Sequence, residues 1–189
     1  MSTAFRRPES VCLYCGSSND ADPRYLAAAT TFGRQTAEAG LKLVYGGGGV
    51  GLMGAAARAA HEAGGKVLGI MPEFLRGREM LFDDVETIVV SNMHERKMIM
   101  FEQSDAFVVM PGGIGTLEEI VELLSWRRLD LHAKPVVFAN LDGFWNPLFE
   151  LFEHTIEARL TPPSFRNAWT SVDTVEQVVP ALLQSAKAA

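Results

Sequence analysis

Short apolar runs alternate along the chain with stretches that carry apolar residues at helical spacing. The runs are rich in β-branched residues and show no strict polar alternation, which is typical of strands buried on both faces of a parallel sheet. The pattern predicts strands at Ser10–Cys15, Lys42–Tyr45, Lys66–Met71, Glu86–Val90, Ala106–Met110, Pro135–Asn140 and Ala168–Val172. It predicts helices at Asp22–Ala39, Leu52–Ala63, Met93–Gln103, Thr116–Leu129, Pro147–Ala158 and Thr174–Ala186.

This order of elements predicts one α/β domain over residues 1–189: a Rossmann-like, doubly wound fold whose mainly parallel sheet of about seven strands has helices on both faces. The chain contains no internal repeat, low-complexity linker or break in composition. We expect residues 1–9 and 184–189 to be frayed.

Several helix boundaries can be read from local sequence. Asn92 and Glu95 fit a capping box, and Asn146 before Pro147 fits an N-cap followed by the first helical position. Glycines in left-handed geometry are expected to end helices at Gly40, Gly64 and Gly65. In the helix Thr116–Leu129, the stripe expected to face the sheet consists of Leu117, Ile120, Val121, Leu124 and Arg128.

Composition narrows the class of protein. Hydrophobic residues make up 48% and charged residues 21%, which is ordinary for a globular protein. The net charge of −6 argues against a general nucleic-acid binder, which needs clustered basic residues. No apolar run approaches the roughly 18 residues of a membrane span, and no apolar segment follows the arginines near the N-terminus. We therefore expect a cytoplasmic enzyme or binding domain with neither a nucleic-acid nor a membrane partner.

The two cysteines form a C-x-x-C pair, Cys12 and Cys15, inside a predicted strand. A thioredoxin-type redox pair instead follows its strand and opens a helix, so the sequence favours ordinary strand cysteines over redox chemistry. The four histidines show no ligand spacing with one another or with the cysteines. No metal site is predicted.

The first glycine-rich segment, Gly46–Gly54, follows the second predicted strand. The G-x-G-x-x-G fingerprint of dinucleotide-binding proteins belongs on the first strand–helix turn, with an acidic residue about 20 positions further along the chain. Here the segment follows the second strand, and Glu73 is the only acidic residue available at that distance. A P-loop is excluded because no Gly-Lys-Ser/Thr follows. One alternative is a tight turn that needs small residues for packing. Six glycines in nine positions favour contact with a ligand, and we expect that contact at Gly46, Gly47 and Gly48.

The second segment, Pro111–Glu119, directly follows the strand Ala106–Met110. It places backbone amides and a helix N-terminus at the carboxyl end of a strand, where open α/β sheets bind ligands. Thr116 and Glu119 also match the T-x-x-E capping box, which carries no chemistry. Spacing alone does not separate a cap from a catalyst.

Together, several segments resemble the LOG family, the cytokinin riboside 5′-monophosphate phosphoribohydrolases that are often mislabelled as lysine decarboxylases. The P-G-G-x-G-T-x-x-E run at Pro111–Glu119 with Arg96-Lys97 upstream is the specific signature. The resemblance extends over nearly the whole chain, through Tyr14–Ser18, Gly46–Gly54, Lys134-Pro135-Val136 and Leu141-Asp142-Gly143-Phe144.

The resemblance implies hydrolysis of the N-glycosidic bond of a nucleoside 5′-monophosphate, with no cofactor and no metal. It implies Arg96 and Glu119 as the catalytic pair, and a homodimer with the site near the subunit interface. The substrate contacts that it implies are Glu79, Lys97, Gly113, Ile114, Gly115, Thr116 and Ser125. We expect substrate contacts at Gly112 and Glu118 of the same segment as well. The chain departs from the family in the length of Arg76–Asp84, and Ser125 stands where the family has threonine.

These residue types suit the reaction. Breaking a ribosyl C–N bond develops positive charge on the sugar, which a carboxylate such as Glu119 can stabilise, or it can position the attacking water. Arg96 cannot act as an acid at neutral pH, but it can hold phosphate or ribose oxygens or orient Glu119. If the family resemblance is set aside, the sequence around Arg96 favours a solvated helix residue that pairs with a neighbouring acid.

Two other functions are compatible with the glycine-rich segments. A non-catalytic nucleotide or cofactor carrier needs the backbone amides but no carboxylate, so Arg96 and Glu119 discriminate against it. A nicotinamide-dependent dehydrogenase would depend on the glycine fingerprint alone.

Overall fold

The computed structural model describes residues 7–185, in which seven parallel strands form one sheet. The strands are β1 (Ser10–Tyr14), β2 (Lys42–Tyr45), β3 (Val67–Pro72), β4 (Glu86–Val90), β5 (Ala106–Val109), β6 (Val136–Ala139) and β7 (Thr170–Val172). Their order across the sheet is β4-β3-β2-β1-β5-β6-β7. The chain therefore winds outward from β1 in one direction and then from β5 in the other.

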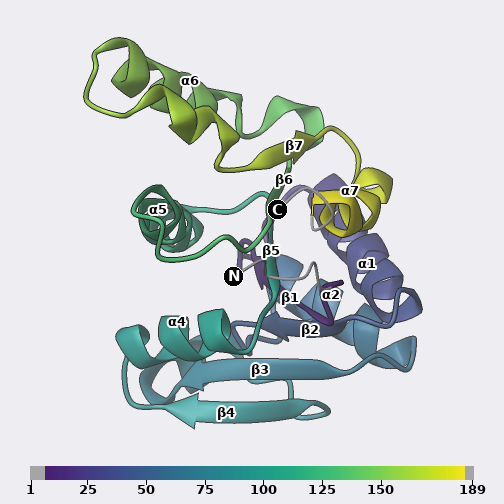
Figure 1. Cartoon of the computed structure of the whole chain (residues 1–189). Helices are drawn as coiled ribbons and strands as arrows, with labels where there is room; N and C mark the ends of the chain where they lie inside the picture. The colour runs from purple at the N-terminus through teal and green to yellow at the C-terminus, as the bar shows by residue number, and fades with distance from the viewer. Residues whose placement is uncertain (1–6, 186–189) are drawn as a thin grey trace.

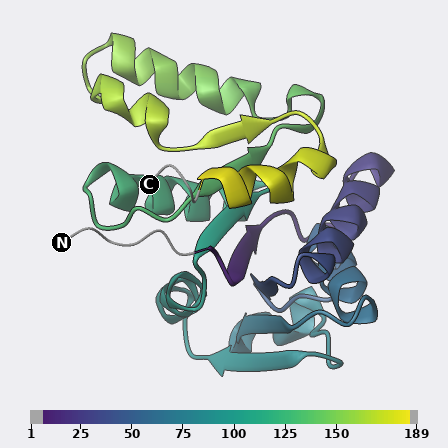
Figure 2. The same ribbon diagram turned by 45° about the vertical axis from the view of Figure 1, so that its right-hand side comes forward.

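Helices cover both faces of this sheet. They are α1 (Pro23–Glu38), α2 (Gly51–Glu62), α3 (Arg76–Glu79), α4 (Met93–Glu102), α5 (Ile114–Arg128), α6 (Asn146–Glu157) and α7 (Val178–Ser185). Helices α1, α2 and α7 pack on one face, and α4, α5 and α6 pack on the other (Figure 1). Figure 2 shows α6 and β7 at the end of the sheet opposite β4.

Two apolar cores result, because successive strand residues point to opposite faces. In β1, Val11 and Leu13 pack with α1, α2 and α7, whereas Cys12 and Tyr14 pack with α4, α5 and α6. All five residues of β1 are buried. Burial on both faces explains why the strand runs are continuously apolar instead of alternating.

The direction in which the chain adds strands to the sheet reverses between β1 and β5, which makes this position a topological switch point. Val11 pairs with Leu43 of β2 on one side and with Ala106 of β5 on the other. Beyond the strands, the Gly16 amide donates to the Pro111 carbonyl at 3.0 Å, so the loops after β1 and β5 stay in contact. Open α/β sheets bind ligands at this position.

The predicted Rossmann-like α/β fold is confirmed, and the ends of the predicted strands shift by no more than two residues. The last predicted helix divides into a 3₁₀ turn at Val175–Gln177 and α7; its final residue, Ala186, lies outside the described residues. Helix α3 was not predicted. Fraying is wrong for Glu9, whose carbonyl accepts from Lys42, and for Gln184, which lies in α7. Residues 1–6 and 186–189 are outside the described part.

Two predicted caps need correction. The Asn92 side chain caps α4 through the Glu95 amide at 2.9 Å, but the Glu95 carboxylate accepts from the Ser91 amide and not from Asn92. The N-cap prediction for Asn146 is wrong: it lies inside α6, and its side chain accepts from Asn140 at 2.8 Å. Asn92 therefore caps α4 without the reciprocal bond from Glu95, whereas Asn146 bonds Asn140 and does not cap α6.

Two further expectations were partly wrong. Gly40 and Gly64 do adopt left-handed geometry, but Gly65 does not; a Cβ there would lie 2.6 Å from the Ala37 Cβ. In α5, Ile120 and Leu124 face the core, whereas Val121 and Arg128 are exposed and Leu123 is buried in their place. The sheet-facing stripe therefore runs along a neighbouring line of the same helix.

Candidate active site

A cavity of about 310 Å³ opens at the carboxyl ends of β1 and β5, beside the switch point. Its walls come from the loop after β1, the first turn of α2, helices α3 and α4, and the start of α5. The lining residues are Cys15, Gly16, Ser17, Ser18, Met53, Glu79, Arg96, Gly113, Ile114, Gly115, Thr116 and Glu119. Segments far apart in the sequence therefore meet in one hollow.

Helix α5 begins at this cavity with uncapped backbone amides. Its N-cap is Gly113, which has no side chain to satisfy them. The N–H groups of Gly113 and of the three residues after it lack intrahelical acceptors, since the Leu117 amide is the first to donate back, to the Gly113 carbonyl at 3.0 Å. The helix dipole adds partial positive charge there. The cavity therefore contains a binding position suited to an anion.

The glycines before and inside this turn have different roles. A Cβ on Gly112 would lie 2.1 Å from the Thr116 hydroxyl oxygen, so the chain itself requires glycine there. A Cβ on Gly113 or Gly115 would meet nothing within 4 Å. Because no protein atom fills the space beside Gly113 and Gly115, that space is open to a ligand.

The capping interpretation of Thr116 and Glu119 is wrong. Helix α5 starts at Ile114, so Thr116 is already its third residue and no side chain caps the helix. Thr116 is buried against Gly112. Glu119 lines the cavity one turn beyond the free amides. The T-x-x-E spacing therefore places a carboxyl group in the cavity.

Arg96 is buried at the back of the cavity, and its side chain is only 5% exposed. Its Nε donates to the Ile70 carbonyl at 3.1 Å, and its Nη2 donates to the Gly46 carbonyl at 2.8 Å. Nη2 also pairs with Glu79 Oε2 at 3.3 Å. The interpretation of Arg96 as a solvated helix residue is therefore wrong; its guanidinium is fixed on three sides.

The first glycine-rich segment holds this arginine. A Cβ on Gly46 would lie 2.1 Å from Arg96 Nη2, so any larger residue would displace the guanidinium. The Gly49 amide donates to the Glu79 and Met80 carbonyls at 3.0 and 2.6 Å. The segment thus positions both Arg96 and α3. Gly46, Gly47 and Gly48 are buried and do not line the cavity.

Glu79 reaches the cavity because the chain turns sharply after α3. Met80 adopts a left-handed φ of 46°, an uncommon conformation for a residue with a side chain. The Gly49 bonds described above hold this turn in place. As a result, the Glu79 carboxylate lies both at the cavity and against Arg96.

Glu119 has the most perturbed carboxyl group of the site. Burial raises the pKa of Glu119 to about 7. The Arg96 charge opposes this rise, Glu118 and Glu79 add to it, and Lys97 opposes it. A carboxyl group with a pKa near neutrality exchanges protons readily at physiological pH, as general acid–base catalysis requires.

Comparison of the sequence with known proteins shows the family to which this chain belongs. Residues 53–182 match the family model described as "Possible lysine decarboxylase". The chain is 41% identical over 174 residues to the cytokinin riboside 5′-monophosphate phosphoribohydrolase LOG5 of Arabidopsis thaliana, covering 92% of this chain and 76% of that protein. It is 42% identical to the probable enzyme of the same type LOGL2 of Oryza sativa subsp. japonica, covering 93% and 71%. The chain belongs to the LOG family.

Among solved structures, this LOG-family chain is similar to the molybdenum cofactor carrier protein of Chlamydomonas reinhardtii. The TM-score is 0.71 at 27% identity, and the alignment covers 95% of this chain and 98% of that one. The molybdenum cofactor binding protein of Rippkaea orientalis gives a TM-score of 0.66 at 25% identity, with 94% and 96% covered. Fold similarity therefore includes proteins whose names describe binding alone.

Four of the expected substrate contacts lie away from the cavity. Lys97 and Glu118 pair with each other behind it, Gly112 lies behind the α5 turn, and Ser125 is exposed on α5. None of the four lines the cavity. Direct substrate contacts at these positions, and at the first glycine segment, remain predictions.

The loop after β1 contributes lining residues that were not predicted as site residues. Cys15, Gly16, Ser17 and Ser18 all face the cavity. Their signal in the sequence is their place directly after the first strand, but the strand order is needed to bring that strand beside β5. Met53, from α2, carries no polar signal that could have identified it.

The cysteines behave as buried strand residues. Burial raises the pKa values of Cys12 and Cys15 well above the ordinary range, and Glu119 adds to both shifts. Both groups therefore stay protonated, which disfavours the reactivity of a redox pair. Within residues 7–185, no group of three His, Cys, Asp or Glu side chains could hold a metal ion.

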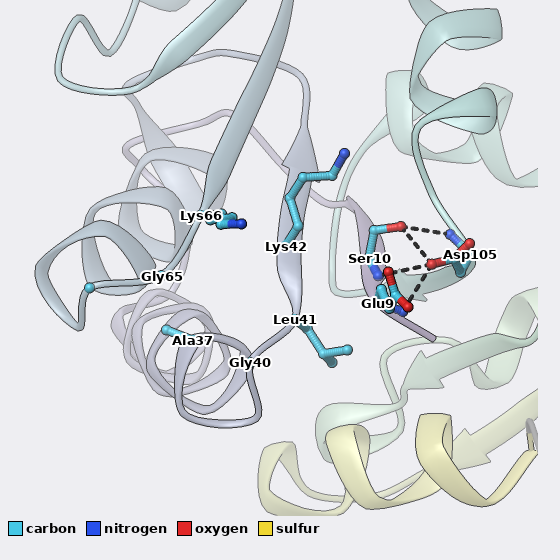
Figure 3. Close-up of a pocket in the computed structure, with 10 residues that line it drawn as sticks. Glu9, Ser10, Ala37, Gly40, Leu41, Lys42, Gly65, Lys66 and Asp105 are labelled. Carbon is cyan, nitrogen blue, oxygen red and sulfur yellow. Dashed lines mark hydrogen bonds between the residues drawn. The ribbon is translucent and has the colours of Figure 1, made fainter. Parts of the chain in front are cut away.

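A larger hollow of about 600 Å³ lies at the opposite edge of the sheet, at the amino ends of the strands (Figure 3). Asp105 Oδ2 accepts from the Ser10 amide at 3.1 Å and from the Ser10 hydroxyl at 3.0 Å. Lys42 donates to Gln103 at 3.1 Å. These hydrogen bonds join segments at the amino ends of the strands.

No helix in the described part of the chain is both long and apolar enough to cross a membrane.

Proposed function

We propose that this chain hydrolyses the N-glycosidic bond of a cytokinin riboside 5′-monophosphate or an AMP-like nucleotide, releasing an adenine-type base and ribose 5-phosphate. The observation that carries the proposal is Glu119, a carboxyl group of raised pKa in the same cavity as the uncapped amides of α5. The names of the relatives that are about 40% identical over most of the chain support this reaction.

The start of α5 binds the phosphate. The amides from Gly113 to Thr116 supply donors, and the empty space beside Gly113 and Gly115 lets phosphate oxygens approach the backbone. Anchoring the phosphate there fixes the distance between the sugar and Glu119, which is one turn further along the helix.

Glu119 and Arg96 carry the chemistry. The Glu119 carboxylate takes a proton from the attacking water, whose oxygen bonds to C1′. The C1′–N bond pair leaves with the base, which takes up the proton held by Glu119, so one water is consumed and Glu119 returns to the carboxylate. Arg96 Nε and Nη2 already have protein acceptors, and Nη1 has the Met93 sulfur at 3.9 Å. Nη1 is therefore the donor that holds ribose or phosphate oxygen.

The direct test is release of free base. Purified protein is incubated with AMP and, separately, with isopentenyladenosine 5′-monophosphate, and the products are separated by chromatography. We expect adenine or isopentenyladenine with ribose 5-phosphate in equal amounts. The alternative function is a nucleotide or cofactor carrier, which the similarity to carrier proteins at 27% identity supports. Binding without base release would favour the carrier.

The pH profile should report Glu119. Since the carboxylate is the active form, kcat/KM for AMP should fall about tenfold per pH unit below the Glu119 pKa of about 7 and be level above it. The second ionisation of a phosphate, near pH 6, adds a separate limb. The pH profile of the residual activity of Glu119→Gln is the control, because this variant keeps the limb due to the phosphate and loses the limb due to Glu119. A profile that is level from pH 6 to pH 8 would contradict the role of Glu119.

Two matched glycine variants separate ligand binding from folding. Gly115→Ala places a methyl group in the open space of the cavity, so we expect the KM for AMP to rise about tenfold or more. Its stability should be unchanged or about 0.5 kcal/mol higher, since alanine favours a helix. Gly112→Ala clashes with Thr116 and should lower stability by about 1–3 kcal/mol. Kinetics and thermal unfolding measure both, and an unchanged KM in Gly115→Ala would exclude the α5 phosphate site.

We further propose that the chain forms a homodimer in the cytoplasm, with the site near the subunit interface. Exposed apolar side chains on and after α5 support an interface beside the cavity, namely Ile114, which lines the cavity and is 84% exposed, Val121, Leu129 and Leu131. Light scattering after size-exclusion chromatography measures the mass, and cell fractionation measures the compartment.

A further inference from the structure

Lys97 lies next to Arg96 on α4, but its side chain turns towards α5 and away from the cavity. It is only 10% exposed and does not line the cavity. The Lys97 Nζ lies 2.5 Å from Glu118 Oε1 and 3.1 Å from Glu122 Oε1. Glu118 and Glu122 are one turn apart on α5, so both carboxylates face the same ammonium.

This ion pair joins the sequence neighbours of the two catalytic residues. Arg96 and Lys97 are adjacent on α4, and Glu118 and Glu119 are adjacent on α5. A change in the Lys97–Glu118 distance therefore shifts the helix that carries Arg96 relative to the helix that carries Glu119. Displacements of about 1 Å in a catalytic constellation can cost about 100-fold in rate.

We propose that Lys97 is a positioning residue that fastens α4 to α5 through Glu118 and Glu122, and so sets Arg96 against Glu119 without contacting the substrate. This inference rests on the proposed function, because it assigns a role within that reaction. It replaces the direct substrate contact that the family resemblance suggests for Lys97.

The energetics of the pair are consistent with a fixed contact. Burial opposes the charge on Lys97, but the hydrogen bonds that its ammonium donates to Glu118 and Glu122 outweigh it and raise the pKa of Lys97. The ammonium is therefore charged and held by two acceptors. Lys97 is the buried member of the contact, whereas Glu118 is 52% exposed, so solvent screens part of the attraction between them.

The pair also acts on Glu119 electrostatically, with opposite signs from its two members. Lys97 lowers the pKa of Glu119 and Glu118 raises it. The other groups that face Glu119 are unchanged by substitution at either position; they are Arg96 of α4, Glu79 of α3 and, from β1 and the residue after it, Cys12, Tyr14 and Cys15. Substitutions at Lys97 and Glu118 should therefore shift the acid limb of the pH profile in opposite directions.

Three variants test the proposal. In Lys97→Met we expect kcat for AMP to fall about 10- to 100-fold, KM to change less than about threefold, and the acid limb to move to higher pH. In Glu118→Gln the limb should move to lower pH. Lys97→Arg keeps the charge and both acceptors, so it should retain kcat within about fivefold. Lys66→Met is the control, since Lys66 is exposed at the opposite edge of the sheet (Figure 3).

Two outcomes would overturn the proposal. A rise in KM with unchanged kcat in Lys97→Met would make Lys97 a substrate contact. Shifts of the limb in the same direction, or none, would remove the positioning role. If Lys97→Met does not fold, the test depends on Lys97→Arg and Glu118→Gln. Glu118 is 52% exposed, so its replacement should be tolerated by the fold.

Failure of the proposed function gives a different result. Wild-type protein would then release no base, and kinetics could not address Lys97. Carbon-13 NMR titration of the Glu119 carboxyl group measures the same opposite shifts without any turnover. Opposite shifts of the Glu119 pKa in the Lys97 and Glu118 variants would support the positioning role of Lys97 even in a protein that only binds its ligand. Absence of these shifts would overturn that role.

Discussion

Replacing Glu119 with glutamine should lower kcat for base release by about 10²–10³-fold and should stabilise the fold at alkaline pH. The loss of rate follows because the amide neither takes a proton from water nor carries the charge that stabilises the ribosyl transition state. A loss of this size is typical when one preorganised electrostatic group is removed from a site. Initial rates with saturating AMP measure it.

The gain in stability follows from the raised pKa of Glu119. Folding raises this pKa from an ordinary value of 4.5 to about 7, so the folded state holds the proton more tightly than the unfolded state. The stabilisation that comes from this tighter proton binding is fully present below pH 4.5 and is lost as the pH rises through about 7. At pH 8, glutamine removes the cost of a buried carboxylate, and we expect about 2–3 kcal/mol of added stability.

The same comparison at pH 5 should show little difference between Glu119→Gln and the wild type. Denaturant unfolding at both pH values measures the effect. Glu150→Gln is the matched control, since Glu150 is exposed on α6 and should change neither rate nor stability. Preserved activity with a lower melting temperature in Glu119→Gln would mean that this carboxyl group is only structural.

Arg96→Met should abolish base release and destabilise the fold by about 3–5 kcal/mol. The substitution leaves the Glu79 carboxylate without its partner and removes the donors to the Ile70 and Gly46 carbonyls. We expect kcat/KM to fall by about 10³-fold or more, since the guanidinium both holds substrate and offsets charge around Glu119. Unfolding free energies and rates with AMP measure both effects.

The double variant Arg96→Met with Glu79→Gln separates the two effects. Neutralising Glu79 removes the uncompensated charge, so stability should recover in part while activity stays absent. Recovery of activity in the double variant would show that Arg96 acts only by neutralising Glu79. A single variant as stable as the wild type would contradict the buried pairing described above.

Local sequence predicts the parts of this fold that depend on local interactions. Continuous apolar runs identify strands such as β1 because a strand buried on two faces has no polar side. Helix α5 follows from the helical spacing of apolar residues such as Ile120 and Leu124, and the start of α4 follows from the cap at Asn92. The start of α5 is ambiguous in the sequence, because T-x-x-E fits both a cap and a catalytic pattern. Only the position of Gly113 as N-cap decides between them.

The features that local sequence misses depend on contacts between distant segments. Helix α3 and the turn at Met80 are held by Gly49, which lies well before them in the chain. The burial of Arg96 depends on carbonyl groups of Ile70 and Gly46. Lys97, adjacent to Arg96 in sequence, lies outside the cavity because it pairs with α5. No periodicity within a helix reports contacts of this kind.

A crystal structure of Glu119→Gln with AMP bound addresses the arrangement as a whole. We expect the phosphate oxygens within hydrogen-bonding distance of the backbone amides between Gly113 and Thr116. We expect C1′ of the ribose to face the substituted side chain at position 119, with room for one water molecule, and Arg96 Nη1 to contact a sugar or phosphate oxygen. A phosphate bound elsewhere, or a side chain at position 119 directed away from C1′, would contradict the proposed reaction.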